Sequence, residues 1–466
     1  MGSSQSAQAA GNVATSINGF GDSMFGQLQA AAKPEADIFL SPFGIARALG
    51  MLLNAVEPGG ESYRQLQQVV FGSAAAAAAD GGALDALNSQ LLQLSMALTQ
   101  ESSATLSVSD ANSVWVAQRY QLQAAYADAL KASFGAAAAP ITSAAAINAW
   151  VEGATGGKIR ELVDESAVRQ ATIILINAIY FKGDWLHPFK KAATVPRDFF
   201  PLLHSSTTVQ AATMSQTYKP VSKIRTALLP AVTNGGTKLT CPAVCLPYKA
   251  ANSPNSGSPA VRARGRQERE QPGEFYGVVA MPGGELSTTA ADDGSRRLVL
   301  HGGATVSYRE ALTACRTALL SNLLPPEVGA DGGAAESPWQ LQERKDIKLY
   351  LPRFEVDFCA SLNDSLSALG VKKPFAGGDI TRIAADGSGN ALRDLFVSDV
   401  LHKVYAKVDE TGTEAAAATA VMMCRCAMPM PREEMELRFD RPFIFAVVHG
   451  PSGLALFCGE VHNPET

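Results

Sequence analysis

The sequence predicts an α+β fold in which helices pack around a large β-sheet. Apolar residues at helical spacing after Ser41 indicate a core-facing helix, and the apolar run 172–181 is typical of a strand covered on both faces. Near the C-terminus, the apolar runs 443–448 and 454–461 are joined by the turn residues 450–453, as in a buried β-hairpin. Helices and buried strands therefore occur together in this chain.

The elements can be justified in chain order. A helix is predicted to begin at Ser41, whose hydroxyl can accept a hydrogen bond from a free backbone N–H, and Pro42 is tolerated at the first helical position. Its core-facing residues recur at helical spacing: Ile45, Leu49, Leu52 and Leu53. Residues 73–84, rich in alanine and glycine, are expected to form a loop or a frayed helix. A further helix is predicted over 147–155, before the strand at 172–181.

Length, composition and charge narrow the function classes. The 466 residues carry 39 Lys and Arg against 44 Asp and Glu, a formal net charge of −5, and 47% of them are hydrophobic. This apolar share can form a sizeable core. The slightly acidic charge argues against nucleic-acid binding, which needs a basic patch, and no apolar run approaches the about 20 residues that span a bilayer. Length alone predicts two or three domains, or one large domain with insertions. Segments 250–273 and 325–340 look inserted, because small, polar and turn-forming residues dominate them.

The N-terminus and the cysteines indicate a cytoplasmic protein that uses no metal or other cofactor. Residues 1–15 lack the basic start and the apolar run of a secretory signal, and an odd number of cysteines, seven, indicates free thiols. No further ligand at zinc spacing accompanies the two close cysteine pairs, Cys241/Cys245 and Cys424/Cys426. Gly2 followed by Ser6 matches the N-myristoylation pattern, so acylation of Gly2 is a further hypothesis.

The segment 410–431 allows two interpretations. Local propensity favours a helix over its alanine run, continuing into a loop. As a strand, the same segment would place small or apolar residues on one face by period-2 alternation: Thr413, Ala415, Ala417, Thr419 and Val421. Glu414 would lie on the opposite face, where water can reach its carboxylate. The strand interpretation thus leaves one face uncharged enough to be buried in a sheet.

Five segments, in the same order along the chain, resemble the serpin family. They are Asp37–Pro42, Asn177–Trp185, Leu351–Phe354, Glu410–Glu414 with the alanine run that follows, and Arg441–Phe445. The fourth is the most specific, since it is similar to the hinge of an inhibitory reactive-centre loop. The resemblance covers nearly the whole chain. It implies a single serpin domain over 1–466, with a large central sheet, further sheets and an exposed reactive-centre loop at 410–435.

For function, the resemblance implies a suicide inhibitor of proteases and not an enzyme. A protease cleaves the exposed loop and forms an acyl-enzyme, and the cut loop then enters the central sheet as a new strand. The hinge residues implied by the resemblance are Glu410, Gly412, Thr413, Glu414, Ala415, Ala416, Ala417 and Ala418. The expected partner is a trypsin-like serine protease, held covalently by a monomeric inhibitor. A cysteine protease is an alternative target.

The cleaved bond is predicted between Arg425 and Cys426. A trypsin-like protease has an acidic specificity pocket, which pairs with a guanidinium. The family's commoner loop length, counted from Gly412, would instead place the cut after Cys426, and Met423 is a third alternative. From Gly412 to Arg425 the extended chain spans about 45 Å, at about 3.3–3.6 Å per residue, which is a plausible reach for insertion.

Five further residues correspond to the region where the sheet of a serpin opens: Trp185, Arg353, Ser41, Asn177 and His402. Trp185 is similar to the aromatic residue at the point of loop entry, although a buried core aromatic is an equally good interpretation. Arg353 is expected to pair with Glu410 at the hinge. The last three resemble a buried polar cluster beneath the sheet. Gly44 stands where the family usually has Ser, which predicts a thinner hydrogen-bond network.

Functions of other classes are less well supported. A serine hydrolase needs a nucleophile motif such as G-x-S-x-G, which the chain lacks, and residues 153–158 have neither the glycine spacing nor the hydroxyl of a nucleotide-binding loop. A non-inhibitory serpin that acts as a chaperone or binding protein is the main alternative, although its hinge would be bulkier than residues 413–419. The alanine-rich stretch after Phe71 lacks the basic helix that binds heparin in some serpins, so no heparin activation is expected.

Overall fold

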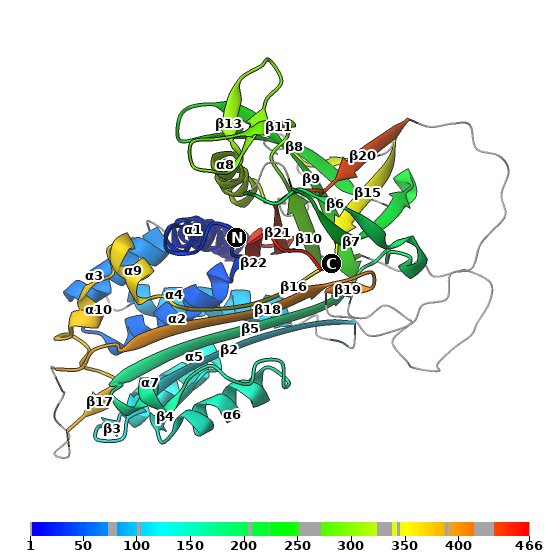
Figure 1. The fold of residues 1–466 in the computed structure, drawn as a ribbon. Helices are drawn as coiled ribbons and strands as arrows, with labels where there is room; N and C mark the ends of the chain where they lie inside the picture. The colour runs from blue at the N-terminus through cyan, green and yellow to red at the C-terminus, as the bar shows by residue number, and fades with distance from the viewer. Residues whose placement is uncertain are drawn as a thin grey trace, which may run out of the picture.

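The computed structural model describes residues 2–72, 82–99, 105–203, 207–222, 224–250, 272–323, 338–342, 345–386, 394–413 and 433–465, with the single residues 103, 390 and 392. The fold is α+β, as predicted, with helices packed around three larger sheets (Figure 1). Of the two segments that look inserted, 250–273 and 325–340, only the ends belong to the described residues.

The central sheet has six strands in the order β16-β18-β19-β5-β2-β4. Their bounds are β16 (Phe354–Ser361), β18 (Asp399–Val408), β19 (Gly412–Thr413), β5 (Ile173–Asp184), β2 (Leu106–Ala117) and β4 (Ala137–Ile141). The strand predicted from the apolar run at 172–181 is confirmed as β5, which is buried along most of its length. It pairs antiparallel with β2 and parallel with β18, from Ile174–Asp399 to Tyr180–Tyr405.

Two further sheets lie beside the central one. Seven strands follow the order β1 (Ile38–Leu40), β22 (Leu454–Val461), β21 (Phe443–His449), β10 (Pro272–Ala280), β9 (Lys238–Lys249), β8 (Arg225–Val232) and β14 (Gln340–Leu341). The predicted C-terminal hairpin is confirmed, because β21 and β22 pair antiparallel and are buried throughout. Four strands follow the order β20 (Glu434–Arg438), β15 (Asp346–Pro352), β7 (Val209–Tyr218) and β6 (Val195–Phe199).

Two small sheets complete the described β-structure. One contains β11 (Glu285–Ala290), β12 (Arg296–Val299) and β13 (Thr305–Ser307), and the other pairs β3 (Gln121–Leu122) with β17 (Ala384–Ala385). The three-stranded sheet stands beside α8 (Tyr308–Ser321), which packs on the seven-stranded sheet (Figure 1). Nothing in the spacing of residues 285–307 predicted it.

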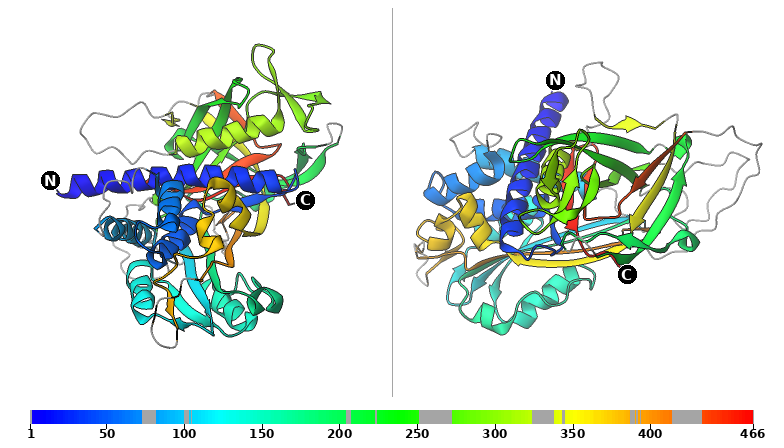
Figure 2. Two further views of the ribbon diagram at one scale, coloured as in Figure 1. Left: turned by 90° about the vertical axis from the view of Figure 1, so that its left-hand side faces the viewer. Right: turned by 45° about the horizontal axis from the view of Figure 1, so that its top comes forward.

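Helices lie on both faces of the central sheet (Figure 2). The face toward the seven-stranded sheet carries α1 (Gly2–Ala31), α2 (Pro42–Ala55), α3 (Glu61–Leu66, continued by a π-helix at Gln67–Phe71), α4 (Gly82–Thr99), α5 (Ala124–Phe134), α9 (Asn363–Leu369) and α10 (Lys373–Ala376). The opposite face is covered by α6 (Ala144–Ala154) and α7 (Glu165–Arg169). Short 3₁₀ turns occupy Lys191–Ala193 and Pro220–Ser222.

Both sequence-predicted helices are confirmed. Ser41 caps α2, because its Oγ accepts the Gly44 N–H at 3.0 Å, and α2 is buried except for one residue. The helix expected over 147–155 is α6, and of the stretch 73–84 the last three residues begin α4. None of the described helices is both long and apolar enough to cross a membrane.

The main core lies between the central and the seven-stranded sheets, around α2. Its largest side chains are aromatic and almost fully buried, among them Phe39, Phe43, Phe181 and Phe354. A separate core between the central sheet and α6 contains Trp115 and Ile147. The central sheet is therefore held on both faces, and a change in its strand number must be accommodated by both cores.

Candidate functional site

The short strand β19 lies between two longer strands of the central sheet, β18 and β5. The chain leaves β18 at Val408, turns, and enters the sheet again as β19, where Thr413 is opposite Val408 on β18 and Gly183 on β5. Gly412 is opposite Asp184. Since β19 is antiparallel to both neighbours, β18 and β5 are separated there and pair directly with each other only farther along. We call the stretch of direct β5–β18 pairing the seam.

The turn before β19 is fixed by one carboxylate. Oδ1 of Asp409 accepts the Thr411 N–H at 2.7 Å and the Thr411 hydroxyl at 2.5 Å, and the Asp409 N–H donates to the Gly412 carbonyl at 2.9 Å. Position 412 must be glycine, because a Cβ there would lie 2.0 Å from the Gly183 carbonyl oxygen. The close approach of two backbones thus explains the predicted hinge residue Gly412.

Thr413 is anchored in the core through its hydroxyl. Its side chain is buried, and its Oγ1 lies 2.7 Å from the phenolic oxygen of Tyr248. Burial raises the pKa of Tyr248, so its phenol stays protonated and available as a donor. The Tyr248 ring in turn stacks on Trp185 with centroids 4.5 Å apart and planes at 11°.

Trp185 is buried and contacts the segment that precedes β19. It is a core aromatic, 1% exposed, and it also binds the hinge: its Nε1 donates to the Asp409 carbonyl at 3.1 Å and its backbone N–H to the Thr411 carbonyl at 2.8 Å. Withdrawal of the hinge from the sheet would break both hydrogen bonds. The indole of Trp185 is therefore a natural fluorescent reporter of hinge position.

Glu410 is held in a buried position beside the hinge. Its carboxylate accepts the Thr194 hydroxyl at 2.6 Å and lies 3.8 Å from the nearer guanidinium nitrogen of Arg353. Arg353 makes a closer contact, 3.0 Å, with Glu465 near the C-terminus. The predicted Glu410–Arg353 ion pair is present, but Arg353 is shared and Thr194 makes the shorter bond. A hollow of about 410 Å³ lies against these side chains.

Farther along the seam, the sequence-predicted polar residues meet at His402. Its Nε2 accepts the Ser41 backbone N–H at 3.0 Å, so the proton is on Nδ1, which donates to Oδ1 of Asn177 at 2.8 Å. Burial lowers the pKa of His402 to about 3, so the ring is neutral at physiological pH. Because Asn177 is on β5 and His402 on β18, their hydrogen bond crosses the seam.

The network is larger than the sequence predicted. Nδ2 of Asn177 donates to Asp110 at 2.8 Å and to Asn112 at 3.0 Å, and Asp110 forms an ion pair with Arg47 at 2.5 Å. Both charged side chains are about 5% exposed or less. The thinner network expected from Gly44 stays a prediction. A Cβ at Gly44 would lie 2.4 Å from Asn177 Oδ1, so the missing side chain makes room for the amide.

Comparison with known proteins identifies the fold. A family model described as Serpin (serine protease inhibitor) matches residues 15–254 and 334–464. The chain belongs to the serpin family. This serpin is 27% identical to leukocyte elastase inhibitor A of Mus musculus, over 93% of this chain and 94% of that protein. It is 28% identical to Iripin-8 of Ixodes ricinus, over 93% and 90% respectively.

The solved structures agree with this assignment. Arabidopsis AtSerpin1 in its native stressed conformation matches this serpin with a TM-score of 0.66 and 21% identity, over 98% of both chains. The serpin fold is thus confirmed, and the family description supports serine protease inhibition in general terms. The small sheet β11–β13 falls in the stretch that the family model leaves unmatched.

The described residues include some predicted site residues of this serpin, and the structure brings these together. At the hinge it unites Glu410, Gly412, Thr413, Trp185 and Arg353; along the seam it unites Ser41, Asn177 and His402. The remaining predictions lie outside the described residues: Glu414, Ala415, Ala416, Ala417, Ala418, Arg425 and Cys426.

Contributors missed from the sequence include Thr194, Tyr248, Asp110 and Arg47. The first two are ordinary strand and loop residues with no motif around them. Of the other two, only Arg47 carried a usable signal, because it places a charge among apolar residues of a helix that reads as core. Asp110 lies among small and polar residues of β2. Within the described ranges, no group of three or more His, Cys, Asp or Glu side chains could hold a metal ion.

Proposed function

We propose that this serpin inhibits a trypsin-like serine protease as a suicide substrate. The catalytic serine attacks the carbonyl carbon of Arg425, the Arg425–Cys426 bond breaks, and the amine of Cys426 leaves with a proton. The acyl-enzyme is then trapped because the cut loop enters the central sheet. The observation that carries the proposal is β19: two hinge residues already lie between β18 and β5, antiparallel to both.

The register of β19 supports insertion of the residues that follow. If each further residue pairs in the same register, Glu414 lies between Lys182 on β5 and Lys407 on β18. Both lysines are on the face of the sheet away from the main core, where a carboxylate can stay hydrated and ion-paired. This agrees with the alternation read from the sequence, which places Glu414 on the face opposite the small and apolar residues.

The same register gives the buried face small residues. Thr419 would then lie level with Asn177 on β5 and His402 on β18, where its hydroxyl can offer a donor and an acceptor to groups that the opened seam leaves unpaired. Insertion therefore replaces the Asn177–His402 hydrogen bond instead of only destroying it. Ala415 and Ala417 would face the core, where larger side chains would clash.

The length of β5 matches the loop. Its twelve residues, Ile173–Asp184, would be paired by residues 412–423, so that Arg425 lies just past the far end of the strand. A protease bound to Arg425 would thus be carried about 40 Å along the sheet, at about 3.3 Å per residue. Every inserted residue would pair antiparallel with β18 and with β5, in place of the parallel pairing between these two strands. Antiparallel pairing is slightly more stable per residue, so the inserted state is favoured.

Two alternatives lead to different outcomes in one experiment. The protein is mixed with trypsin and run on denaturing electrophoresis, and the released C-terminal peptide is sequenced. A covalent band with a peptide that begins at Cys426 would support the proposal. Cleavage without a covalent band would favour a non-inhibitory serpin that acts as a chaperone or binding protein. A covalent band with papain and none with trypsin would indicate a cysteine-protease inhibitor.

The remaining expectations are part of the same proposal. We infer that residues 1–466 form one serpin domain that works as a monomer in the cytoplasm, with no cofactor, nucleic acid or heparin. Two sequence observations support this inference: the acidic net charge and the alanine-rich stretch after Phe71. Inhibition of trypsin at equal rates with and without heparin is the expected result.

A further inference from the structure

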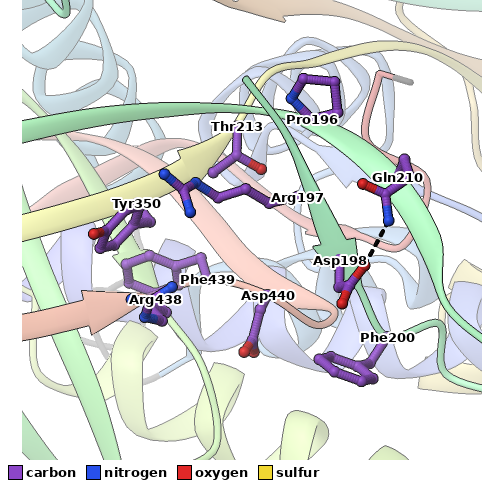
Figure 3. A pocket seen from close by; sticks show the side chains of 10 residues that line it. All are labelled: Pro196, Arg197, Asp198, Phe200, Gln210, Thr213, Tyr350, Arg438, Phe439 and Asp440. Atoms are coloured by element: carbon purple, nitrogen blue, oxygen red, sulfur yellow. Dashed lines mark hydrogen bonds between the residues drawn. The ribbon is translucent and has the colours of Figure 1, made fainter. Parts of the chain in front are cut away.

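A second hollow lies over the four-stranded sheet, apart from the seam. It measures about 460 Å³, and its lining includes Arg197, Asp198, Tyr350, Arg438, Phe439 and Asp440 (Figure 3). The residues come from β6, β15, β20 and the segment after β20, which are far apart in the sequence. The mechanism proposed above assigns no role to these side chains.

Two guanidinium groups meet at one phenol in this hollow. Arg197 lies 4.7 Å from the centroid of the Tyr350 ring and Arg438 lies 4.2 Å from it. They approach from opposite sides along the sheet, since β20 is the neighbour of β15 and β6 lies beyond β7. Stacking on an aromatic face holds a guanidinium in place and leaves its N–H edge free to bind an anion.

The two arginines differ in their partners. Arg438 forms an ion pair with Glu436. Arg197 makes no hydrogen bond or ion pair through its side chain with any residue that the structure describes, and its Nε is sealed from solvent. A half-buried guanidinium with no counter-charge is costly, because burial removes part of its hydration and no described hydrogen-bond acceptor replaces that water. Arg197 is thus the unsatisfied group of the hollow.

The acidic residues of the lining do not supply that counter-charge. Asp198 accepts a hydrogen bond from the Gln210 side chain at 2.5 Å, and Asp440 pairs with Arg441 at 2.7 Å. In Figure 3, Asp198 and Gln210 lie on one side of the hollow, while Arg197 and Arg438 gather around Tyr350 on the other. The charges are segregated, and the open positive side is the one near Tyr350.

We propose that this hollow binds an oxyanion, a carboxylate or a phosphate group, through the N–H edge of Arg197. Arg438 supplies the second positive charge, and the Tyr350 ring restrains both guanidinium groups beside the hollow. The ligand is either a small free anion or the carboxylate of an acidic side chain on a bound protein. This site is independent of the proposed protease inhibition.

The test is calorimetric titration of the full-length protein at constant ionic strength. Inorganic phosphate represents a free anion, and N-acetylglutamate amide represents a protein carboxylate. We expect saturable binding of at least one of them, weakened about tenfold or more in Arg197→Gln, since the lost contact is a charge-assisted hydrogen bond. Arg160→Gln is the matched control, because Arg160 is 76% exposed and does not line the hollow.

Two further variants control for loss of binding through misfolding. Arg197→Lys keeps the charge but not the planar fork, so its affinity should fall between those of the wild type and Arg197→Gln. Arg438→Gln should weaken binding less than Arg197→Gln, because Glu436 already neutralises Arg438. The proposal is overturned if neither anion saturates the wild type, or if Arg197→Gln, with an unchanged near-ultraviolet circular dichroism spectrum, binds as tightly as Arg160→Gln.

Discussion

Acidification should destabilise this serpin through one buried imidazole. His402 is fully buried and bonded as a neutral ring, accepting from Ser41 and donating to Asn177. Burial lowers the pKa of His402 to about 3, against about 6.5 in an unfolded chain. Between these values the unfolded state binds more protons than the folded state. Stability that is fully present above about pH 6.5 is therefore lost progressively as the pH falls toward 3.

The size of the effect follows from the two pKa values. One pKa unit corresponds to about 1.4 kcal/mol of differential stability. At pH 4, which is about 2.5 pH units below the pKa of the unfolded imidazole, the unfolded state is protonated, while the folded ring is still almost entirely neutral. The free energy of unfolding should thus fall by about 3 kcal/mol between pH 7 and pH 4 on account of His402 alone.

The assay compares the wild type with His402→Gln. Glutamine offers one acceptor and one donor, as the neutral ring does, but does not titrate in this range. Urea unfolding is followed by tryptophan fluorescence at pH 7, 5.5 and 4. Other titrating groups, such as His449, whose pKa burial lowers, are common to both proteins and cancel in the comparison. Equal pH dependence of the two unfolding free energies would refute the reasoning.

Three further predictions concern the hinge, the network and the loop. Thr413→Arg should convert the inhibitor into a substrate, because the site of Thr413 is 1% exposed and cannot hold a long cation. Trypsin should cleave this variant without forming an SDS-resistant complex. The control Thr413→Ser keeps the hydroxyl and should still form the complex. Asp110→Ala should lower the free energy of unfolding by about 3–5 kcal/mol, since it leaves Arg47 buried without its partner; the exposed Asp128→Ala is the control, and similar urea midpoints for the two variants would contradict the prediction. Arg425→Ala should abolish the covalent complex with trypsin, while Cys426→Ser should retain it; retention of the complex in Arg425→Ala, with the cut after another residue, would move the reactive bond.

The elements that could be predicted from sequence are those with a local pattern. Ser41 with Pro42 marks a helix start, and the run from Ile173 gives a buried strand, because capping and burial leave a signal within a few residues. The polar cluster at His402 was anticipated only through the family resemblance. Its partner on β5 is 225 residues away, and no spacing rule connects them.

The unpredicted part of the site arises from contacts between distant segments. Asp110 and Arg47 are on a strand and a helix separated by 63 residues, and only the folded sheet shows that they share one ion pair. The hollow around Arg197 is assembled from four strands in the same way. Gly44 shows the same dependence on distant segments, because its missing side chain provides the space that Asn177 occupies.

If the proposed mechanism holds, β19, the wedge that Gly412 and Thr413 form between β18 and β5, also sets the working lifetime of the inhibitor. Because its first pairs are already made, insertion needs no separate nucleation step, and its speed depends on how easily the seam opens. The chain continues from Thr413 into the loop, so the intact loop begins at the same two residues. On the proposed mechanism, any change that speeds the capture of a protease also shortens the time for which an unused molecule stays active.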